Sequence, residues 1–494
     1  MKTIEWLGNV FISDNLNTFF AYLCLLSIFL IIGKVLRVRV KILQDFFIPA
    51  SIIGGFVGLI CGPFILGAVY PGKNDVFLNL LSNIRIGFSS FPGRFIDVVF
   101  AAMFIGITLP SIKKMWNLGG RQFAYGTMVG GPMQHFIGGL LVIFLLGPLF
   151  GVDPTFATFA AIGFCGGHGT AGGMAPSFRE GYPGLNWSFP EGADLLMTSA
   201  TVGVLIASIV GIILINIGAK KGYCKRLKEP KELPEEVRVG VIPYDKKYTI
   251  AEATVSPESI EPFAFHVALV FIAVAIGYII DDLLALLGIF LSNITGKTLV
   301  ATAFDAVPTF PLAMIGGVIL QFFLKSFGIV DIIDRNTIER IQGVALDFLV
   351  VSAIASISIP VVIAYFVPFF ILLLAVASYI VFATWFIAPR MLTGSWFEKA
   401  MVEFGMQTGV TAMGLCLLRI VDPGFKTEAL EAFGIKQLAY EPFFGGGFVT
   451  ALSPLLILTA GPYWFCLIML SITLFFVVVG IFSGWFHKKD TGVA

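Results

Sequence analysis

The sequence predicts an all-α polytopic membrane protein, with about ten transmembrane helices in two inverted repeats of five helices each. Its composition is the first reason. Of the 494 residues, 57% are hydrophobic and 13% are charged, whereas a soluble protein carries about 25% charged residues. The net charge of +1 and the lack of a basic block give no sign of a nucleic-acid partner. The six cysteines are scattered without metal-ligand spacing, and no cofactor is predicted.

The second reason is the succession of apolar runs, because a spanning helix needs about 20 apolar residues. The run at 447–483 is too long for one straight crossing, so we expect an extra turn near Gly461-Pro462. Runs of suitable length and composition lie near residues 17–36, 46–70, 96–112, 122–150, 193–218, 264–286, 307–325, 344–361, 364–388 and 447–483.

Lys and Arg in short loops predict the orientation, since cytoplasmic loops are rich in them. The polar segment 219–263 is expected to be a cytoplasmic linker between a first repeat at 1–218 and a second, inverted repeat at 264–494. Two features oppose this scheme: basic residues in a predicted outside loop, and basic residues at a predicted outside C-terminus. These are Lys73, Arg85 and Arg94 in the loop, and His487, Lys488 and Lys489 at the C-terminus.

The third reason is a glycine-rich stretch, Gly163–Met174, at the end of an apolar run. Each glycine in a helix interior costs roughly 1 kcal/mol relative to alanine, so the cluster predicts a broken or re-entrant segment at about 156–178. Irregular backbone within a bilayer survives only where protein or a water-filled cavity covers it. The alternative is a seam of small residues between packed helices. His168 argues against a seam because it adds a bulky polar group.

A second stretch, Glu403–Gly414, has a similar mix of Gly, Thr and Ala. It predicts a second re-entrant loop at about 401–418. Interrupted apolar segments in matching places of two halves are the best sequence indication of a transporter's binding site. Two sequence similarities between the halves support the repeats. Pro49 and Pro311 are each followed by Gly-Gly five residues later, and Asp97 and Asp347 each precede a proline by thirteen residues (110 − 97 and 360 − 347).

These stretches supply the candidate site residues. The freed N–H groups of a broken helix favour anions, and hydroxyl and carboxylate oxygens suit Na⁺. We therefore predict a substrate site formed by Gly166, Gly167, His168, Gly169, Thr170, Gln134, Gln407, Thr408, Gly409 and Thr411. The predicted Na⁺ ligands are Asp194, Thr201, Thr170 and Thr411.

Each of these assignments has a plainer alternative. Asp194 opens a helix and can serve as its cap, while Gln134 lies mid-helix and can hydrogen-bond to a neighbouring helix. For His168, a structural hydrogen bond is favoured over proton relay. Asp97 and Asp347 lie near predicted helix ends, where a solvated role is as plausible as an ion site. No nucleophile–base pair, phosphate-binding loop or zinc set is evident, so the sequence does not support an enzyme.

The chain resembles the glutamate:sodium symporter family of bacterial transporters over most of residues 17–455. The most specific match is Leu149–Pro154 followed by Gly166-Gly167-His168-Gly169-Thr170. Val307–Phe310, Gly317–Leu320 and Met133-Gln134 are also similar to the family. The resemblance implies Na⁺-coupled uptake of L-glutamate, or of a similar anionic amino acid, across the bacterial cytoplasmic membrane. It also implies inverted repeats and an elevator-like transport domain around both loops; a homodimer is left open.

Two rival functions remain at this stage. The first is an ion channel, since selectivity filters can also be rich in glycine. The second is a carrier for another carboxylate, because the second loop, Gly405–Thr411, departs from the family's pattern. A glutamate site is also expected to offer a cation to a carboxylate. Near the two loops the sequence offers Arg179 and Arg419.

Overall fold

The computed structural model describes residues 13–69, 75–107, 111–182, 184–224, 235–296 and 298–487. This part of the chain is helical, apart from one isolated bridge between Tyr182 and Trp187. Eight of its helices are long and apolar enough to cross a membrane, and the chain is a multi-pass membrane protein. Some residues used in the sequence predictions lie outside the described ranges: Lys73, Pro110, residues 225–234, Lys488 and Lys489.

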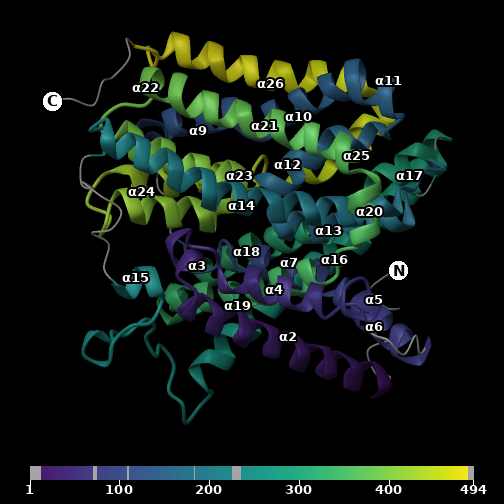
Figure 1. Cartoon of the computed structure of the whole chain (residues 1–494), viewed down its shortest axis with the longest axis horizontal. Coiled ribbons are helices and arrows are strands. Elements are labelled where there is room, and N and C mark those ends of the chain that lie inside the picture. The colour runs from purple at the N-terminus through teal and green to yellow at the C-terminus, as the bar shows by residue number, and fades with distance from the viewer. Residues whose placement is uncertain are drawn as a thin grey trace.

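The helices form two bundles, one above the other in Figure 1. We call them the lower and the upper bundle. In the lower bundle, Gly33 of the first long helix and Gly54 of the short helix that begins at Ala50 allow close contact between the two backbones. This bundle contains α2 (Ser13–Arg39), α3 (Lys41–Asp45), α4 (Ala50–Ile60), α5 (Leu66–Val69), α6 (Asp75–Phe88), α7 (Phe91–Ala101), α16 (Pro262–Thr295), α17 (Thr298–Asp305), α18 (Thr309–Ser326) and α19 (Arg335–Ala355).

The upper bundle is built around α14 (Pro190–Lys220), which packs against the two glycine-rich segments. Its other principal helices are α9 (Gly120–Val129), α10 (Gly131–Leu141), α12 (Phe159–Phe164), α13 (Gly167–Glu180), α21 (Phe366–Phe386), α23 (Trp396–Val421), α24 (Ala429–Tyr440), α25 (Phe448–Ala460) and α26 (Pro462–Phe482). Short helices complete the chain: α8 (Ile112–Lys114), η1 (Met115–Gly119), η2 (Val142–Leu146), α11 (Gly147–Phe150), η3 (Pro154–Thr158), α15 (Glu235–Val239), η5 (Tyr244–Lys246), η6 (Val330–Ile332), α20 (Ile359–Ala364) and α22 (Ala388–Met391).

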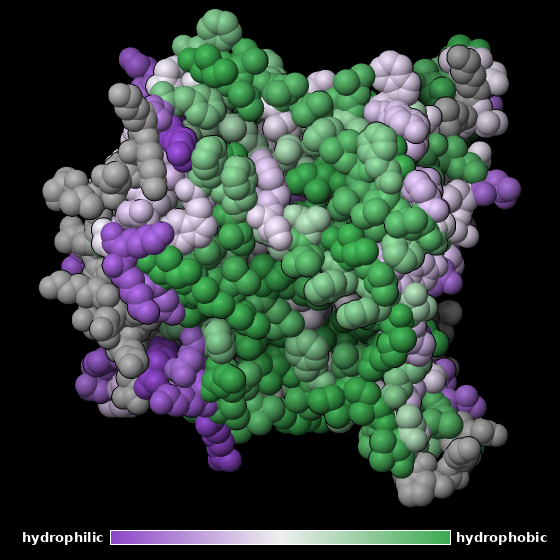
Figure 2. Space-filling view, turned by 45° about the horizontal axis from the view of Figure 1, so that its top comes forward, coloured by the Kyte–Doolittle hydropathy of each residue, from purple (hydrophilic) through white to green (hydrophobic). Residues whose placement is uncertain are grey.

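The surface carries an apolar band between two polar ends (Figure 2). At the left end in Figure 1, the predicted cytoplasmic segments come together. Arg37 donates to the carbonyl of Arg238 at 2.8 Å, and Lys34 also hydrogen-bonds to the linker. Lys114 pairs with Glu431 at 3.1 Å. The basic loops therefore share one face of the molecule, as expected for a single side of a membrane.

The last apolar run is two helices rather than one. Helix α25 ends at Ala460, and α26 begins at Pro462 after Gly461, whose φ is +83°. The predicted turn at Gly461-Pro462 is thus present. Helix α26 returns the chain to the left face in Figure 1, where the N–H of His487 donates to the carbonyl of Arg390 at 2.9 Å. The last described residue, His487, therefore lies on the face of the basic loops, whereas the sequence predicted the C-terminus on the opposite side.

The two bundles meet mainly along α13 and α7. Gly169, Gly172 and Gly173 of α13 face this contact. A Cβ on them would overlap Ile96, Pro92 and Phe310, respectively. These glycines are spaced i, i+3 and i+4, which places them on one face of the helix. The contact is apolar and continuous with the main hydrophobic core.

Candidate functional site

The first glycine-rich segment folds back on itself as a helical hairpin. The rings of Phe159 in α12 and Phe178 in α13 are 5.7 Å apart, whereas 19 residues of straight helix would separate them by about 28 Å. The turn is Cys165-Gly166-Gly167, and Gly167 has φ +64°. A left-handed residue is strained for any side chain but glycine. We call residues 154–180 the first hairpin.

The second glycine-rich segment, α23, is also a hairpin. Gly409 and Val410 have non-helical dihedral angles, with φ +62° at Val410. A Cβ placed on Gly405 would lie 2.7 Å from the Cα of Gly414. Nine residues of straight helix would separate these positions by about 13 Å, so the two arms lie side by side. We call residues 396–421 the second hairpin; each arm is too short to cross a bilayer alone.

The tips of the two hairpins touch. A Cβ on Gly167 would overlap Cγ1 of Val410. Two further helix breaks reach the same place. One is Gly130-Gly131 between α9 and α10, and the other is Glu441–Gly447 between α24 and α25. Gly130 lies against the side chains of Gln407 and Tyr440, and Gly446 lies against Gly166 and Thr170. Four interruptions of helical backbone thus converge in the upper bundle.

Most predicted substrate residues lie at this convergence. Gln134 donates to the carbonyl of Gln407 at 2.8 Å, and the hydroxyl of Thr170 donates to the carbonyl of Gly446 at 3.1 Å. His168 and Thr201 are joined by a 3.0 Å hydrogen bond between Nε2 and Oγ1. These contacts connect the first hairpin to α14 and to the break before α25, and the second hairpin to α10.

Other predicted residues have packing contacts instead. Gly169 faces Ile96 and Leu349 rather than the hairpin tip, which is the small-residue seam weighed as the alternative. Gly409 lies against Ala207 and Met413. The hydroxyl of Thr408 donates to the carbonyl of Phe404 at 2.7 Å, within its own helix.

The predicted Na⁺ ligands are not all together. Asp194 Oδ1 accepts a hydrogen bond from the N–H of Ser358 at 3.0 Å and lies 3.8 Å from Arg85. Both partners come from outside the hairpins. Thr201 lies seven residues further along α14, about 10 Å away along the axis. Thr170 and Thr411 lie near the hairpin tips. Within the described residues, no three His, Cys, Asp or Glu side chains are grouped to hold a metal ion.

The sequence predictions missed a charged network beneath the second hairpin. Lys436 Nζ and Glu403 Oε1 are 2.8 Å apart, and both side chains are 0% exposed. Gln122 Nε2 donates to the other carboxylate oxygen of Glu403 at 2.9 Å. Gln407 Nε2 donates to Glu403 at 2.7 Å and to the hydroxyl of Tyr440 at 3.1 Å. The network joins α9, α23 and α24.

A second, partly buried carboxylate extends this network towards the hairpin tip. Glu441 accepts hydrogen bonds from the hydroxyl of Thr411 at 2.9 Å and from Gln437. Gln437 in turn accepts from Lys436 at 2.7 Å. The ammonium group of Lys436 thus pairs directly with Glu403 and is joined to Glu441 through Gln437. Ionisable groups in a membrane protein's interior are costly and indicate function.

A signal for this network was present in the sequence. Glu403 and Gln407 are four residues apart, as are Lys436 and Tyr440, so each pair lies on one helix face. The triplet Gly445-Gly446-Gly447 marked the fourth break. Chemically, the site combines freed backbone N–H and C=O groups with hydroxyl, amide and carboxylate oxygens. Such a set can bind a small polar anion together with a cation.

Comparison with known proteins agrees with this arrangement. The family model for the sodium/glutamate symporter matches residues 15–415. No curated protein and no solved structure matches the chain. The matched region includes the whole first hairpin, the second hairpin as far as residue 415, and most of the lower bundle. Since it covers more than half of the chain, the protein belongs to the sodium/glutamate symporter family, a family of membrane transporters and not of enzymes.

Proposed function

We propose that the protein is a secondary active transporter that carries L-glutamate, or a similar small anionic amino acid, together with Na⁺. The observation that carries this proposal is the meeting of the two hairpin tips beside two further helix breaks. Interrupted helices that meet in the membrane interior are the usual ligand site of secondary transporters. The matching family supports the choice of glutamate and Na⁺.

In this proposal the substrate binds at the hairpin tips. The backbone of Gly166–Thr170 and the Gln407–Thr411 segment would approach its carboxylates, with Gln134 close by. Thr170 and Thr411 would contribute oxygens to a Na⁺ site, because Na⁺ prefers hard oxygen ligands. Asp194 and Thr201 complete the predicted set; Asp194 stands apart from the tips, whereas Thr201 hydrogen-bonds to His168 of the first hairpin.

The mechanism we propose is elevator-like alternating access. The upper bundle holds both hairpins and would move as one body, while the lower bundle would stay fixed. The glycine face of α13 against α7 is the contact along which the two bundles would move relative to each other. Each bundle would combine helices from both inverted repeats, residues 1–218 and 264–494.

The orientation belongs to the same proposal. The face carrying the linker and the basic loops would be cytoplasmic, and the membrane would be the bacterial inner membrane. A Cys placed at Ser256, in the linker, should resist an impermeant thiol reagent in intact cells. Ready labelling from outside would reverse the orientation.

The deciding experiment is uptake of labelled L-glutamate into proteoliposomes. Uptake should be concentrative with an inward Na⁺ gradient and should be lost when the gradient is replaced by K⁺. Linear, non-saturating flux would indicate a channel. Saturable Na⁺-driven uptake that another carboxylate blocks more strongly than glutamate would indicate a different carboxylate carrier.

A further inference from the structure

A polar cavity of about 400 Å³ lies between the two bundles, at the end of the molecule opposite the basic loops. Its walls are the α6–α7 turn, the outer half of α13 and the α17–α18 link. The cavity begins at Gly172 and Gly173, about one turn beyond the tip of the first hairpin, and extends to Glu180. It is therefore placed between that polar end of the molecule and the proposed binding site.

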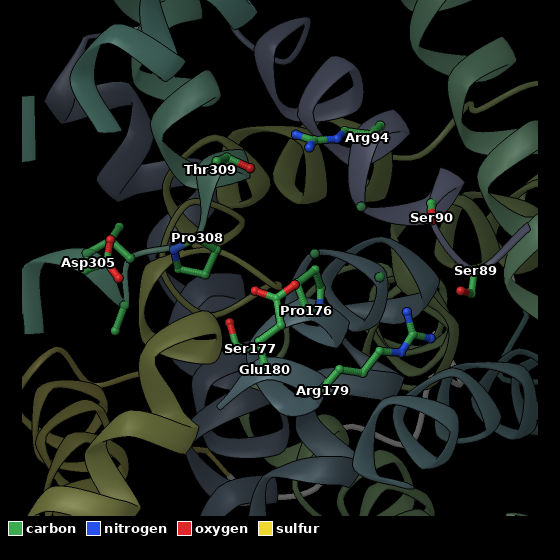
Figure 3. Close-up of a pocket in the computed structure, with 15 residues that line it drawn as sticks. Ser89, Ser90, Arg94, Pro176, Ser177, Arg179, Glu180, Asp305, Pro308 and Thr309 are labelled. Carbon is green, nitrogen blue, oxygen red and sulfur yellow. The ribbon is translucent and has the colours of Figure 1, made fainter. Parts of the chain in front are cut away.

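Two guanidinium groups line this cavity, one from each bundle. Arg94 comes from α7 and Arg179 from the last turn of α13 (Figure 3). Arg94 donates a hydrogen bond to the hydroxyl of Tyr278 at 3.3 Å. Arg179 makes no hydrogen bond or ion pair with any described residue. Guanidinium is the group best suited to bind a carboxylate with two parallel hydrogen bonds.

The same cavity contains carboxylate and hydroxyl groups. Glu180 and Asp305 line it from opposite sides, and Ser177 and Thr309 add hydroxyls (Figure 3). Two cations with neighbouring acids and hydroxyls match a molecule that has two carboxylates and one ammonium. They match a monocarboxylate less well, because one guanidinium would then be left without a partner.

We propose that this cavity is an outward-facing capture site for a dicarboxylic amino acid, with Arg179 and Arg94 each taking one carboxylate. The inference rests on the proposed function and adds to it the residues that select the substrate. Because the two arginines come from different bundles, capture takes place only while the bundles hold this relative position. The amino acid then continues to the hairpin tips.

The test is Na⁺-driven uptake by Arg179→Gln and Arg94→Gln in proteoliposomes, with L-glutamine as competitor. Loss of one charge-assisted contact should raise the KM for glutamate about tenfold. The Vmax should change less than about twofold, because the hairpin tips are intact. The preference for glutamate over glutamine should fall by a similar factor, and Arg179→Lys should restore part of it.

The matched control is Arg390→Gln. Arg390 lies in α22, over the ring of Phe386 and outside both the cavity and the hairpins, so its KM should stay at the parental value. Parental KM and glutamate preference in both cavity variants would overturn the capture site. If the parental protein itself takes up no glutamate, the proposed function fails, and that result is distinct from the first.

A labelling experiment tests the site independently of transport. A Cys at Ser177 should react with an impermeant maleimide added from outside, and L-glutamate should slow that reaction while L-glutamine does not. Equal rates with and without glutamate would overturn the proposal, even if the arginine variants failed to fold.

Discussion

The two hairpins have similar shapes but opposite surroundings. The first hairpin presents Gly169, Gly172 and Gly173 to the lower bundle, and the side chains that pack against these glycines, Ile96, Pro92 and Phe310, are uncharged. The second hairpin is fixed within the upper bundle by Glu403, whose charge is met by Lys436 of α24. The chain reverses direction in both hairpins, at Gly166-Gly167 in the first and at Gly409-Val410 in the second.

This difference indicates a division of labour. A neutral contact of small residues can shift without separating charges, whereas a buried ion pair keeps its two helices together, because separating it leaves charges unpaired. The second hairpin, α24 and α9 should therefore act as one rigid unit. The first hairpin should be where the upper bundle contacts and moves against the lower one.

The largest expected effect comes from the buried pair. Lys436→Met leaves Glu403 and Glu441 without a counter-charge, and removing one partner of a buried pair costs about 3–5 kcal/mol. We expect a much lower melting temperature in detergent. Glu403→Gln combined with Lys436→Met should recover part of the loss, because the double change removes both charges.

The matched control lies on the same hairpin. Lys399 pairs with Glu428 at 3.1 Å, near the surface, and the Glu428 side chain is 48% exposed. Lys399→Met should cost less than about 1 kcal/mol. Equal melting temperatures for the Lys399 and Lys436 variants would refute the rigid unit.

The next largest effect concerns the glycines. Gly169→Val should push Ile96 away at the bundle contact, and overpacking of this kind costs about 1–3 kcal/mol. Gly409→Val crowds Ala207 and Met413 instead. We expect Gly409→Val to abolish uptake with normal surface abundance, and Gly169→Val to lower both abundance and uptake. Adding Ile96→Ala to Gly169→Val should restore its abundance and uptake.

Surface-inserted protein must be measured beside uptake. If Gly169→Val protein were inserted normally and took up glutamate at the parental rate, the contact between α13 and α7 would tolerate a larger side chain at this position. Rescue of Gly409→Val by Ile96→Ala would contradict the assignment of the two glycines to different contacts, because Ile96 does not touch the second hairpin site.

These glycines also show how far the sequence could lead. Composition and glycine clusters predicted a helical membrane protein interrupted in two segments, and the breaks lie inside both. Which glycine faces the tip and which faces α7 depends on where the chain reverses, although the i, i+3, i+4 spacing of Gly169, Gly172 and Gly173 indicated one packed face. The break at Gly445–Gly447 was overlooked because it lies at the edge of a long apolar run.

The sequence could not show which residues pair within the charged network, for a different reason. Lys436 lies in a 12-residue helix that also carries Glu431, and none of the predicted membrane runs or re-entrant loops covered this helix. Its partner Glu403 is 33 residues away (436 − 403), and only the reversal of α23 brings the two together. Such pairings depend on tertiary packing, which local pattern does not encode.

A smaller effect is expected from the threonines at the tips. Thr170→Ala removes a hydrogen bond to Gly446, and Thr411→Ala removes one to Glu441. Each neutral bond is worth about 0.5–1.5 kcal/mol, so uptake should fall several-fold and abundance should hold. If these oxygens bind Na⁺, the half-saturating Na⁺ concentration should rise in both variants. A fall in uptake at unchanged Na⁺ dependence would leave them as structural hydrogen bonds.

The smallest effect is expected at Asp194, a charge on α14 that would give the first hairpin's surroundings an ionic role. Its oxygen accepts from Ser358, and Arg85 at 3.8 Å is a weak, partly exposed partner. Asp194→Asn keeps an acceptor and loses only the pair, which is worth about 0.2–1 kcal/mol. The geometry thus predicts an unchanged Na⁺ dependence and a slight loss of stability. A Na⁺ ligand would instead show a raised half-saturating Na⁺ concentration with substrate affinity preserved at saturating Na⁺. That result would place the coupling ion beside the first hairpin, and the contrast between a neutral and a charged hairpin would no longer hold.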